Sequence, residues 1–299
     1  MRITRTSRVF AVAMLLGAAL AGQKAMGYQT VVQSGYIISE PVLNMYKTPS
    51  LDEAVISSAL YGHAVTVQER KRGWVKIQTA DGYTGWVLAR GLAKPASEYA
   101  PQAVQIASLS ANVYREPDTT KHAPLLRLPF ESRLEVVSRK VASDDEGRWI
   151  QVLLVDGRKA YVQAGDVSSD APHMSIDQTI EFARRFLGIT YTWGGVSSFG
   201  YDCSGFTQML MRQRGIFMPR DADQQANWSG VVAVERKDLR AGDLLYFGKN
   251  IDKISHTGMY IGGGEFIHDT PHGHPGVQIS RLDDDPWTKI LVAARRVKP

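Results

Sequence analysis

Hydrophobic and polar positions follow two different patterns along this chain of 299 residues, and the change lies near Ser175. Before that point, apolar and polar residues alternate around two Asp-Gly pairs, within Gly73–Val87 and Arg148–Val162. Alternation around an Asp-Gly pair is typical of short antiparallel strands joined by a tight turn. After that point, helical and strand-like segments are mixed, which predicts an α+β unit.

The all-β part is an internal repeat. Leu43–Ser50 matches Ala111–Asp118, and the two Asp-Gly segments match each other. Copies of this size predict two small β-barrels, at residues 28–95 and 100–170. Three tryptophans are expected in the barrel cores: Trp74, Trp86 and Trp149. Two linkers are also expected, at Lys94–Gln102 and Ser168–Ser175.

The α+β part, residues 171–299, begins with a predicted helix. Ser175 and Gln178 stand at capping-box spacing at its start, and Gly188 ends it. The apolar residues expected on its buried face are Ile176, Ile180, Ala183 and Leu187.

A second helix is predicted from Cys203, with Asp202 as its N-cap, and a third, short one within Arg220–Gly230. Strands are expected at 242–248, 256–261, 265–270, 276–280 and 290–297. The glycines at 262–264 form the turn between the second and third of these strands.

The first 27 residues have the pattern of an export signal. Three arginines precede the apolar run Val9–Ala21, which is short for a membrane span, and small residues offer cleavage sites near Ala21 or Gly27. We therefore expect an exported protein, located in the periplasm or outside the cell, with an uncleaved anchor as the alternative. No later segment is expected to cross a membrane.

The formal net charge of +5 lies mostly in this leader. Four positive charges and no acid precede Tyr28, so a mature chain beginning there carries +1. That charge gives no reason to expect a nucleic-acid partner.

Cys203 is the only cysteine, so an internal disulfide is excluded. A buried, inert cysteine is one alternative. Its place in the first turn of a helix, however, favours the thiolate. His256 and His268 stand on two strands joined by a glycine turn, which brings both imidazoles to one end of the sheet. A cysteine at a helix start facing a histidine on a strand is the papain-type arrangement.

Five segments, in this order and spacing, resemble the NlpC-type cell-wall cysteine peptidases, which are papain-like: YTWGG, YDCSGF, PRDADQQ, GDLLYF and HTGMYIGGGEFIH. They span most of residues 175–299. The two repeats look like bacterial SH3-type domains. This combination is similar to γ-D-glutamyl-L-diamino acid endopeptidases that trim muropeptides.

The resemblance implies a role for each matched position. Cys203 would be the nucleophile, His256 the base and His268 the third polar residue, while Tyr191 and the Cys203 backbone N–H would bind the oxyanion. Five further residues match positions that contact substrate: Tyr83, Trp193, Asp202, Ser204 and Asp221. Plain core packing for Tyr83 and Trp193, and N-capping for Asp202, are the simpler alternatives.

The same resemblance implies that the first barrel closes the cleft, leaving room for two residues before the scissile bond. Asp221 is our choice for the carboxylate that binds the substrate's free amine, because a buried ammonium needs such a partner. Ala222 departs from the family, which often has Ser there, so one hydrogen bond to substrate would be missing.

We expect hydrolysis of the γ-D-glutamyl–diamino acid bond in peptidoglycan-derived peptides that begin with free L-Ala, by a monomer without metal or organic cofactor. Three alternatives stay open. His268, His272 and His274 could form a zinc site. The chain could be a non-catalytic wall-binding protein, or an endopeptidase on intact cross-linked peptidoglycan. Preference for diaminopimelate or lysine is also open.

Overall fold

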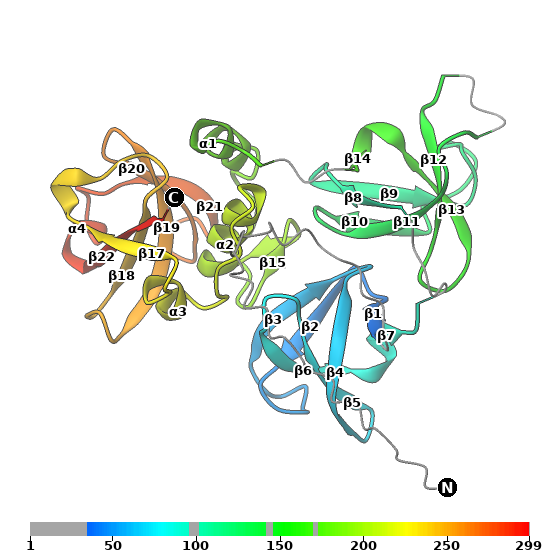
Figure 1. Ribbon diagram of the computed structural model, residues 1–299, viewed down its shortest axis with the longest axis horizontal. Coiled ribbons are helices and arrows are strands. Elements are labelled where there is room, and N and C mark those ends of the chain that lie inside the picture. Colours follow the sequence, from blue (N-terminus) through cyan, green and yellow to red (C-terminus); the bar gives the residue numbers. More distant parts are fainter. Residues whose placement is uncertain (1–34, 96–101, 142–145, 170–172, 299) are drawn as a thin grey trace, which may run out of the picture. The chain divides into compact units, whose positions relative to one another are not determined.

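The computed structural model describes residues 35–95, 102–141, 146–169 and 173–298 (Figure 1). The predicted leader, residues 1–27, lies outside the described residues, as do the middle parts of both predicted linkers. Within the described residues, no helix is both long enough and apolar enough to span a bilayer.

Residues 36–93 form a seven-stranded antiparallel unit. Its strands are β1 Tyr36–Ile38, β2 Val42–Tyr46, β3 Val55–Leu60, β4 Ala64–Lys71, β5 Trp74–Gln78, β6 Thr84–Leu88 and β7 Leu92–Ala93. The short helix η1 (Ala89–Gly91) precedes β7. Alternate side chains such as Met45, Ile77 and Val87 point inward and are fully buried, as the period of two predicts. Gly82 has a φ of +83°, which suits the tight turn between β5 and β6.

Residues 103–168 form a second unit of the same kind. Its strands are β8 Ala103–Ile106, β9 Ser110–Tyr114, β10 Leu126–Pro129, β11 Arg133–Ser138, β12 Trp149–Leu153, β13 Lys159–Gln163 and β14 Val167–Ser168, with η2 (Ala164–Asp166) before the last. The order β3-β2-β6-β5-β4-β1-β7 recurs strand for strand as β10-β9-β13-β12-β11-β8-β14. Both units therefore share one topology, as the internal repeat predicts.

The remaining residues form a six-stranded antiparallel sheet with helices. The sheet has the order β17-β22-β18-β19-β20-β21. Its strands are β17 Val231–Val234, β18 Leu244–Gly248, β19 Ile254–Gly262, β20 Glu265–Thr270, β21 Gly276–Arg281 and β22 Leu291–Val297; the helices are α1 Ile176–Arg184, α2 Cys203–Gln213, α3 Ala222–Ala226, η3 Arg236–Asp238 and α4 Trp287–Ile290. A small hairpin of β15 Val196–Ser197 and β16 Gly200–Tyr201 precedes α2. The sequence patterns missed β17 and α4.

Helix α1 begins as predicted, and most of its predicted face is turned inward: Ala183 is fully buried and Ile180 packs against the main hydrophobic cluster. Ser175 and Gln178 form the reciprocal capping box. The helix ends at Arg184, so Leu187 falls in the following turn and is 46% exposed. Its expected burial is wrong, because a helical period no longer applies there. The residues that pack inward are Thr179, Phe182, Ala183 and Phe186.

Helix α2 is the most enclosed helix of this unit, since Arg212 alone among its residues is not buried. Phe206, Met209 and Leu210 are fully buried in the largest hydrophobic cluster, as predicted. A helix buried on every side is fixed by packing rather than by its own propensity. The position of its first residue, Cys203, is therefore set by the whole unit.

A buried carboxylate attaches the second β unit to α2. Glu131, in the turn between β10 and β11, accepts hydrogen bonds from Arg212 at 3.2 and 2.6 Å and from Gln213 at 2.8 Å. Its backbone oxygen lies 2.8 Å from Nε2 of His63, in the first unit. On the same helix, Gln208 donates to Asp81 of the β5–β6 turn at 3.0 Å. The C-terminal half of α2 thus contacts both β units.

Replacing Glu131 by Ala should leave the Arg212 charge without its buried partner and lower the free energy of unfolding by about 3 kcal/mol. Thermal unfolding followed by circular dichroism measures this. Glu146→Ala removes an exposed carboxylate that pairs with Arg148, and should cost less than about 1 kcal/mol. Equal effects of the two substitutions would show that Glu131 does not anchor α2.

Candidate active site

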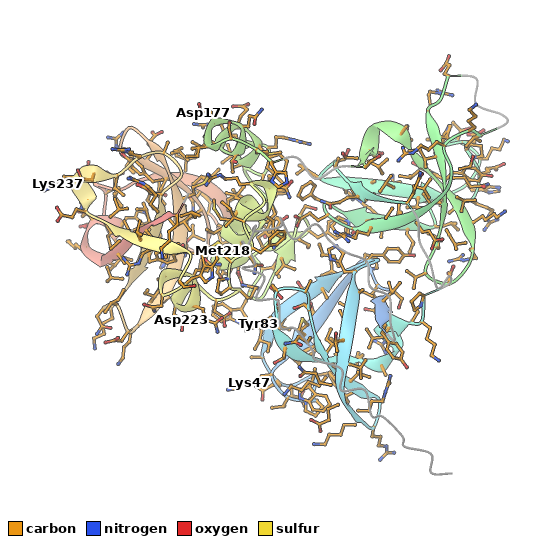
Figure 2. The ribbon with its side chains drawn as sticks, viewed as in Figure 1. Lys47, Tyr83, Asp177, Met218, Asp223 and Lys237 are labelled. Atoms are coloured by element: carbon orange, nitrogen blue, oxygen red, sulfur yellow. The ribbon has the colours of Figure 1, made fainter. Side chains whose placement is uncertain are left out.

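A cavity of about 260 Å³ opens where α2 begins. Its lining comes from the first β unit, the segment before α2 and the start of α3; Tyr83 and Asp223, labelled in Figure 2, belong to this lining. Eight of the sequence-predicted site residues line it: Tyr83, Tyr191, Trp193, Asp202, Cys203, Ser204, Asp221 and Ala222. His256 and His268 are not in the lining, and both are buried.

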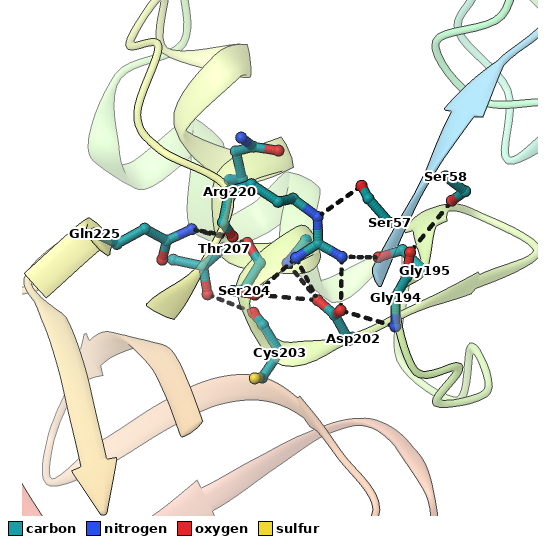
Figure 3. A network of polar contacts seen from close by, with 12 residues as sticks. Ser57, Ser58, Gly194, Gly195, Asp202, Cys203, Ser204, Thr207, Arg220 and Gln225 are labelled. Atoms are coloured by element: carbon teal, nitrogen blue, oxygen red, sulfur yellow. Dashed lines mark hydrogen bonds and ion pairs between the residues drawn. The ribbon is translucent and has the colours of Figure 1, made fainter. Parts of the chain in front are cut away.

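Asp202 shapes the end of α2 that carries Cys203. One carboxylate oxygen accepts from the Gly205 backbone N–H at 2.7 Å, which is the predicted N-cap, and the other accepts from Gly194 N–H at 3.0 Å (Figure 3). Gly205 has no alternative, because a Cβ there would lie 2.2 Å from the Gly195 carbonyl oxygen. The glycine-rich approach and the helix start are therefore one packed structure.

The Cys203 thiol is only 8% exposed, and the backbone N–H groups of Thr257 and Ser204 face it. Burial, and then the charge of Asp202, raise the pKa of this thiol to about 12. The expectation that the helix N-terminus favours the thiolate is thus wrong for the protein without substrate, because desolvation outweighs the partial positive charge of the backbone. The sulfur needs a base to become a nucleophile.

The two histidines form the hydrogen-bonded pair that their strands predict. Nε2 of His256 lies 2.7 Å from Nδ1 of His268, and Nε2 of His268 lies 3.0 Å from the Ser280 hydroxyl. Gly258 makes room for this, because a Cβ there would lie 2.9 Å from Cβ of His268. Since Nε2 of His256 is occupied, Nδ1 is the ring nitrogen left to accept another proton.

Aromatic rings enclose this pair. The Trp287 ring lies 5.2 Å from that of His256 and 4.7 Å from that of His268, and Phe266 lies 4.5 Å from His268. Burial lowers the pKa of His256 to about 3 and that of His268 well below its usual value. Both imidazoles are therefore neutral at physiological pH, which leaves Nδ1 of His256 unprotonated.

In the lining of the same cavity, Asp221 forms a side-chain hydrogen bond with the hydroxyl of Tyr83, which the β5–β6 turn supplies. Burial raises the pKa of Asp221, and burial together with Asp221 raises that of Tyr83 to about 12. Ala222 lines the same wall with a methyl group in place of a hydroxyl.

Tyr191 and Trp193, which precede α2, both line the cavity but differ in exposure. Tyr191 is half-buried, and burial, followed by the nearby Cys203 sulfur, raises its pKa, so its hydroxyl remains a proton donor. Trp193 is 68% exposed at the cavity, which excludes the core-packing alternative for this side chain.

Three residues here were given no role by the sequence analysis. Arg220 is 2% exposed and pairs with both oxygens of Asp202, at 3.0 and 2.6 Å. Asp269 is fully buried, with no hydrogen-bond partner for either carboxylate oxygen among the described residues, and burial raises its pKa to about 8. Trp287 is the third. Of these three, only Arg220 lies in a segment that the sequence analysis matched, PRDADQQ.

The histidines of the zinc alternative are arranged differently from a metal site. Both ring nitrogens of His268 take part in the hydrogen bonds described above. Across the described ranges, no group of three or more His, Cys, Asp or Glu side chains is placed to hold a metal ion.

The buried histidines make stability depend on pH. The fold keeps His256 neutral down to about pH 3, whereas the unfolded chain protonates it below about 6.5. Unfolding therefore takes up protons in acid, and stability that is complete above pH 6.5 is lost as pH falls towards 3.

At pH 5 the loss should be about 2 kcal/mol for this one histidine. The decrease in unfolding free energy between pH 7.5 and 5 should thus be smaller by that amount in His256→Gln than in the wild type or in the exposed-loop variant His274→Gln. An equal decrease in all three proteins would contradict a neutral, buried His256.

Comparison with known proteins shows which family has this arrangement of residues. Residues 188–296 match the NlpC/P60 family, and residues 41–93 match the bacterial SH3 domain. A γ-D-glutamyl-L-lysine dipeptidyl-peptidase of Bacillus cereus is 32% identical over 262 residues, covering 81% of this chain and 75% of that protein. Its namesake in Bacillus subtilis is 29% identical, with 82% of each chain covered.

Solved structures agree with these relatives. The crystal structure of an NlpC/P60 family protein from Bacillus cereus superimposes with a TM-score of 0.75, at 28% identity, covering 89% of this chain and all of the other. The similarity extends over nearly the whole chain, and the matching unit holds a cysteine at a helix start and a buried histidine pair. The chain therefore belongs to the NlpC/P60 family of cysteine peptidases.

Proposed function

We propose that this protein hydrolyses the γ-D-glutamyl–diamino acid bond of peptidoglycan-derived peptides that begin with free L-Ala, and releases L-Ala-γ-D-Glu. The single observation that carries the proposal is the lining of the cavity, which holds both Cys203 and the Tyr83–Asp221 pair. The names of the two Bacillus relatives support the same class of bond.

The substrate's ammonium would bind between Asp221 and Tyr83. Burying an ammonium is costly unless a carboxylate and hydrogen-bond acceptors replace its water. With a volume of about 260 Å³, the cavity suits a short acyl portion of two residues rather than a long peptide. Trp193 and Ser204 would line this portion, and Ala222 would leave one of its polar groups without a hydroxyl partner.

In the acylation step, Nδ1 of His256 takes the thiol proton as Sγ of Cys203 attacks the γ-carbonyl carbon of D-Glu. The Cys203 backbone N–H and the Tyr191 hydroxyl donate to the oxyanion that forms. The C–N bond then breaks, His256 gives its proton to the departing amine, and a thioester remains. His268 holds the His256 ring in the required orientation.

In the deacylation step, water gives a proton to His256 and attacks the thioester carbon. The C–S bond breaks, the proton returns to Sγ, and L-Ala-γ-D-Glu leaves as a free acid. The neutral thiol and imidazole described above are the starting state of acylation, and deacylation restores them. The thiolate of Cys203 and the imidazolium of His256 are therefore formed only during the reaction.

We further propose three domains behind the leader: residues 28–95 and 100–170 as SH3-type domains and 171–299 as the papain-like peptidase domain. The shared strand order supports the same type for both β units. The apolar leader and the family's action on cell walls support export to the periplasm or the medium.

Cys203→Ala should reduce hydrolysis of L-Ala-γ-D-Glu-diaminopimelate by at least about 10³-fold, because no other group can form the thioester. Product formation is followed by liquid chromatography, and an unchanged melting curve shows that the variant is folded. Retained hydrolysis would mean that the nucleophile is another residue, and inhibition of the wild type by a chelator would revive the zinc alternative.

N-acetylation of the substrate's alanine should lower kcat/KM by about 100-fold or more, because the acetyl group removes the charge that Asp221 binds. Asp221→Asn should lower kcat/KM for the free-amine peptide and leave the acetylated peptide nearly unaffected. Asp177→Asn, at an exposed position on α1 outside the cavity lining, is the control. Equal losses on both peptides would argue against an amine pocket at Asp221, and efficient cleavage of intact peptidoglycan would favour the endopeptidase alternative.

A further inference from the structure

The guanidinium of Arg220 is buried next to the site, and the proposed reaction gives it no role. An arginine carries five N–H donors that burial leaves without water. All five have partners here: Nε donates to the Ser57 hydroxyl at 3.2 Å, Nη1 to Asp202 at 3.0 Å and Ser204 at 2.8 Å, and Nη2 to Asp202 at 2.6 Å and the Gly195 carbonyl at 3.5 Å (Figure 3).

These partners come from separate parts of the chain. Asp202 and Ser204 flank Cys203 at the start of α2, and Gly195 belongs to the loop that packs against that helix start. Ser57 lies on β3 of the first β unit and is 4% exposed. Next to it, the Ser58 hydroxyl donates to the Gly194 carbonyl at 3.4 Å. Arg220 therefore joins the first β unit to the residues on both sides of the nucleophile.

We propose that Arg220 is a positioning residue, which orients Cys203 through Asp202 and Ser204 and makes that orientation depend on the contact of the first β unit through Ser57. The first unit would then do more than wall off the cavity. When its contact with the peptidase unit is lost, Nε of Arg220 loses its partner, and the guanidinium can no longer hold Asp202 by both oxygens in a fully satisfied network.

The inference rests on the proposed function, because it concerns the nucleophile of that reaction. Alkylation of Cys203 by iodoacetamide tests it without any peptide, since the thiol must lose its proton to the same base. A wild type that is alkylated but does not cleave the tripeptide would therefore refute the proposed substrate and leave the positioning role measurable.

Two variants and two matched controls form the experiment. Arg220→Lys keeps the charge and loses the planar fork, and Ser57→Ala removes only the partner of Nε. Arg184→Lys, on the exposed face of α1, and Ser39→Ala, in the first β unit far along the chain from β3, are the controls. Melting curves establish that each variant is folded.

Arg220→Lys should lower kcat and the alkylation rate at pH 7.5 at least about tenfold, with KM within about threefold of the wild type; Ser57→Ala should lower both rates about threefold. The controls should match the wild type. In the double variant, Ser57→Ala should have no further effect, because its partner is already gone.

Three outcomes would overturn the proposal. A rise in KM with unchanged kcat and alkylation would make Arg220 a substrate-binding group. Multiplying effects of the two substitutions would show that Ser57 does not act through Arg220. If Arg220→Lys does not fold, equal alkylation rates for Ser57→Ala and Ser39→Ala would refute the dependence on the first β unit.

Discussion

Helix α2 lies within the hydrophobic core, and its apolar side chains pack into the main cluster. A helix enclosed along its length cannot shift without disturbing the core, so the position of its first residue is fixed to the packing of the sheet. Polar contacts at both ends strengthen this: Asp202 caps the N-terminus, and Glu131 holds Arg212 and Gln213 at the other. Cys203 is therefore placed by contacts that reach all three units of the chain.

The same burial sets the chemistry. Removing the thiol and the two imidazoles from water disfavours every charged form, so the resting site is neutral although it sits at a helix N-terminus. A neutral pair protects a lone thiol from oxidation, which acts on the thiolate. In the proposed mechanism, proton transfer is then coupled to attack, and the oxyanion donors compensate for the charge only when it forms.

Local sequence signals predicted the elements well and their electrostatic setting poorly. The capping box at Ser175, the Asp202 cap and the glycine turn before His268 act over a few residues, so their consequences could be inferred directly. The roles of Arg220 and Trp287 depend on partners far along the chain, and no spacing rule reveals them. The charge state of Cys203 was misjudged because the helix end is visible in the sequence, whereas the depth of burial is not.

The internal repeat predicts the shared topology of the two β units but not their contacts with the peptidase unit. Both units have the same strand order, yet they contact the peptidase unit through different residues: the first supplies Tyr83 to the cavity and Ser57 to the guanidinium, and the second supplies Glu131 to the far end of the helix. Tyr83 and Glu131 lie in turns between strands, and Ser57 lies on β3. Divergence at such positions gives equivalent folds different functions.

Trapping the acyl-enzyme shows whether Cys203 forms the thioester with the substrate. Wild-type protein mixed with L-Ala-γ-D-Glu-diaminopimelate and quenched in acid within the first turnover should carry the mass of L-Ala-γ-D-Glu less one water, on the proteolytic fragment that contains Cys203. An adduct on another residue, or steady product formation with no adduct at any time, would contradict a thioester formed at this sulfur.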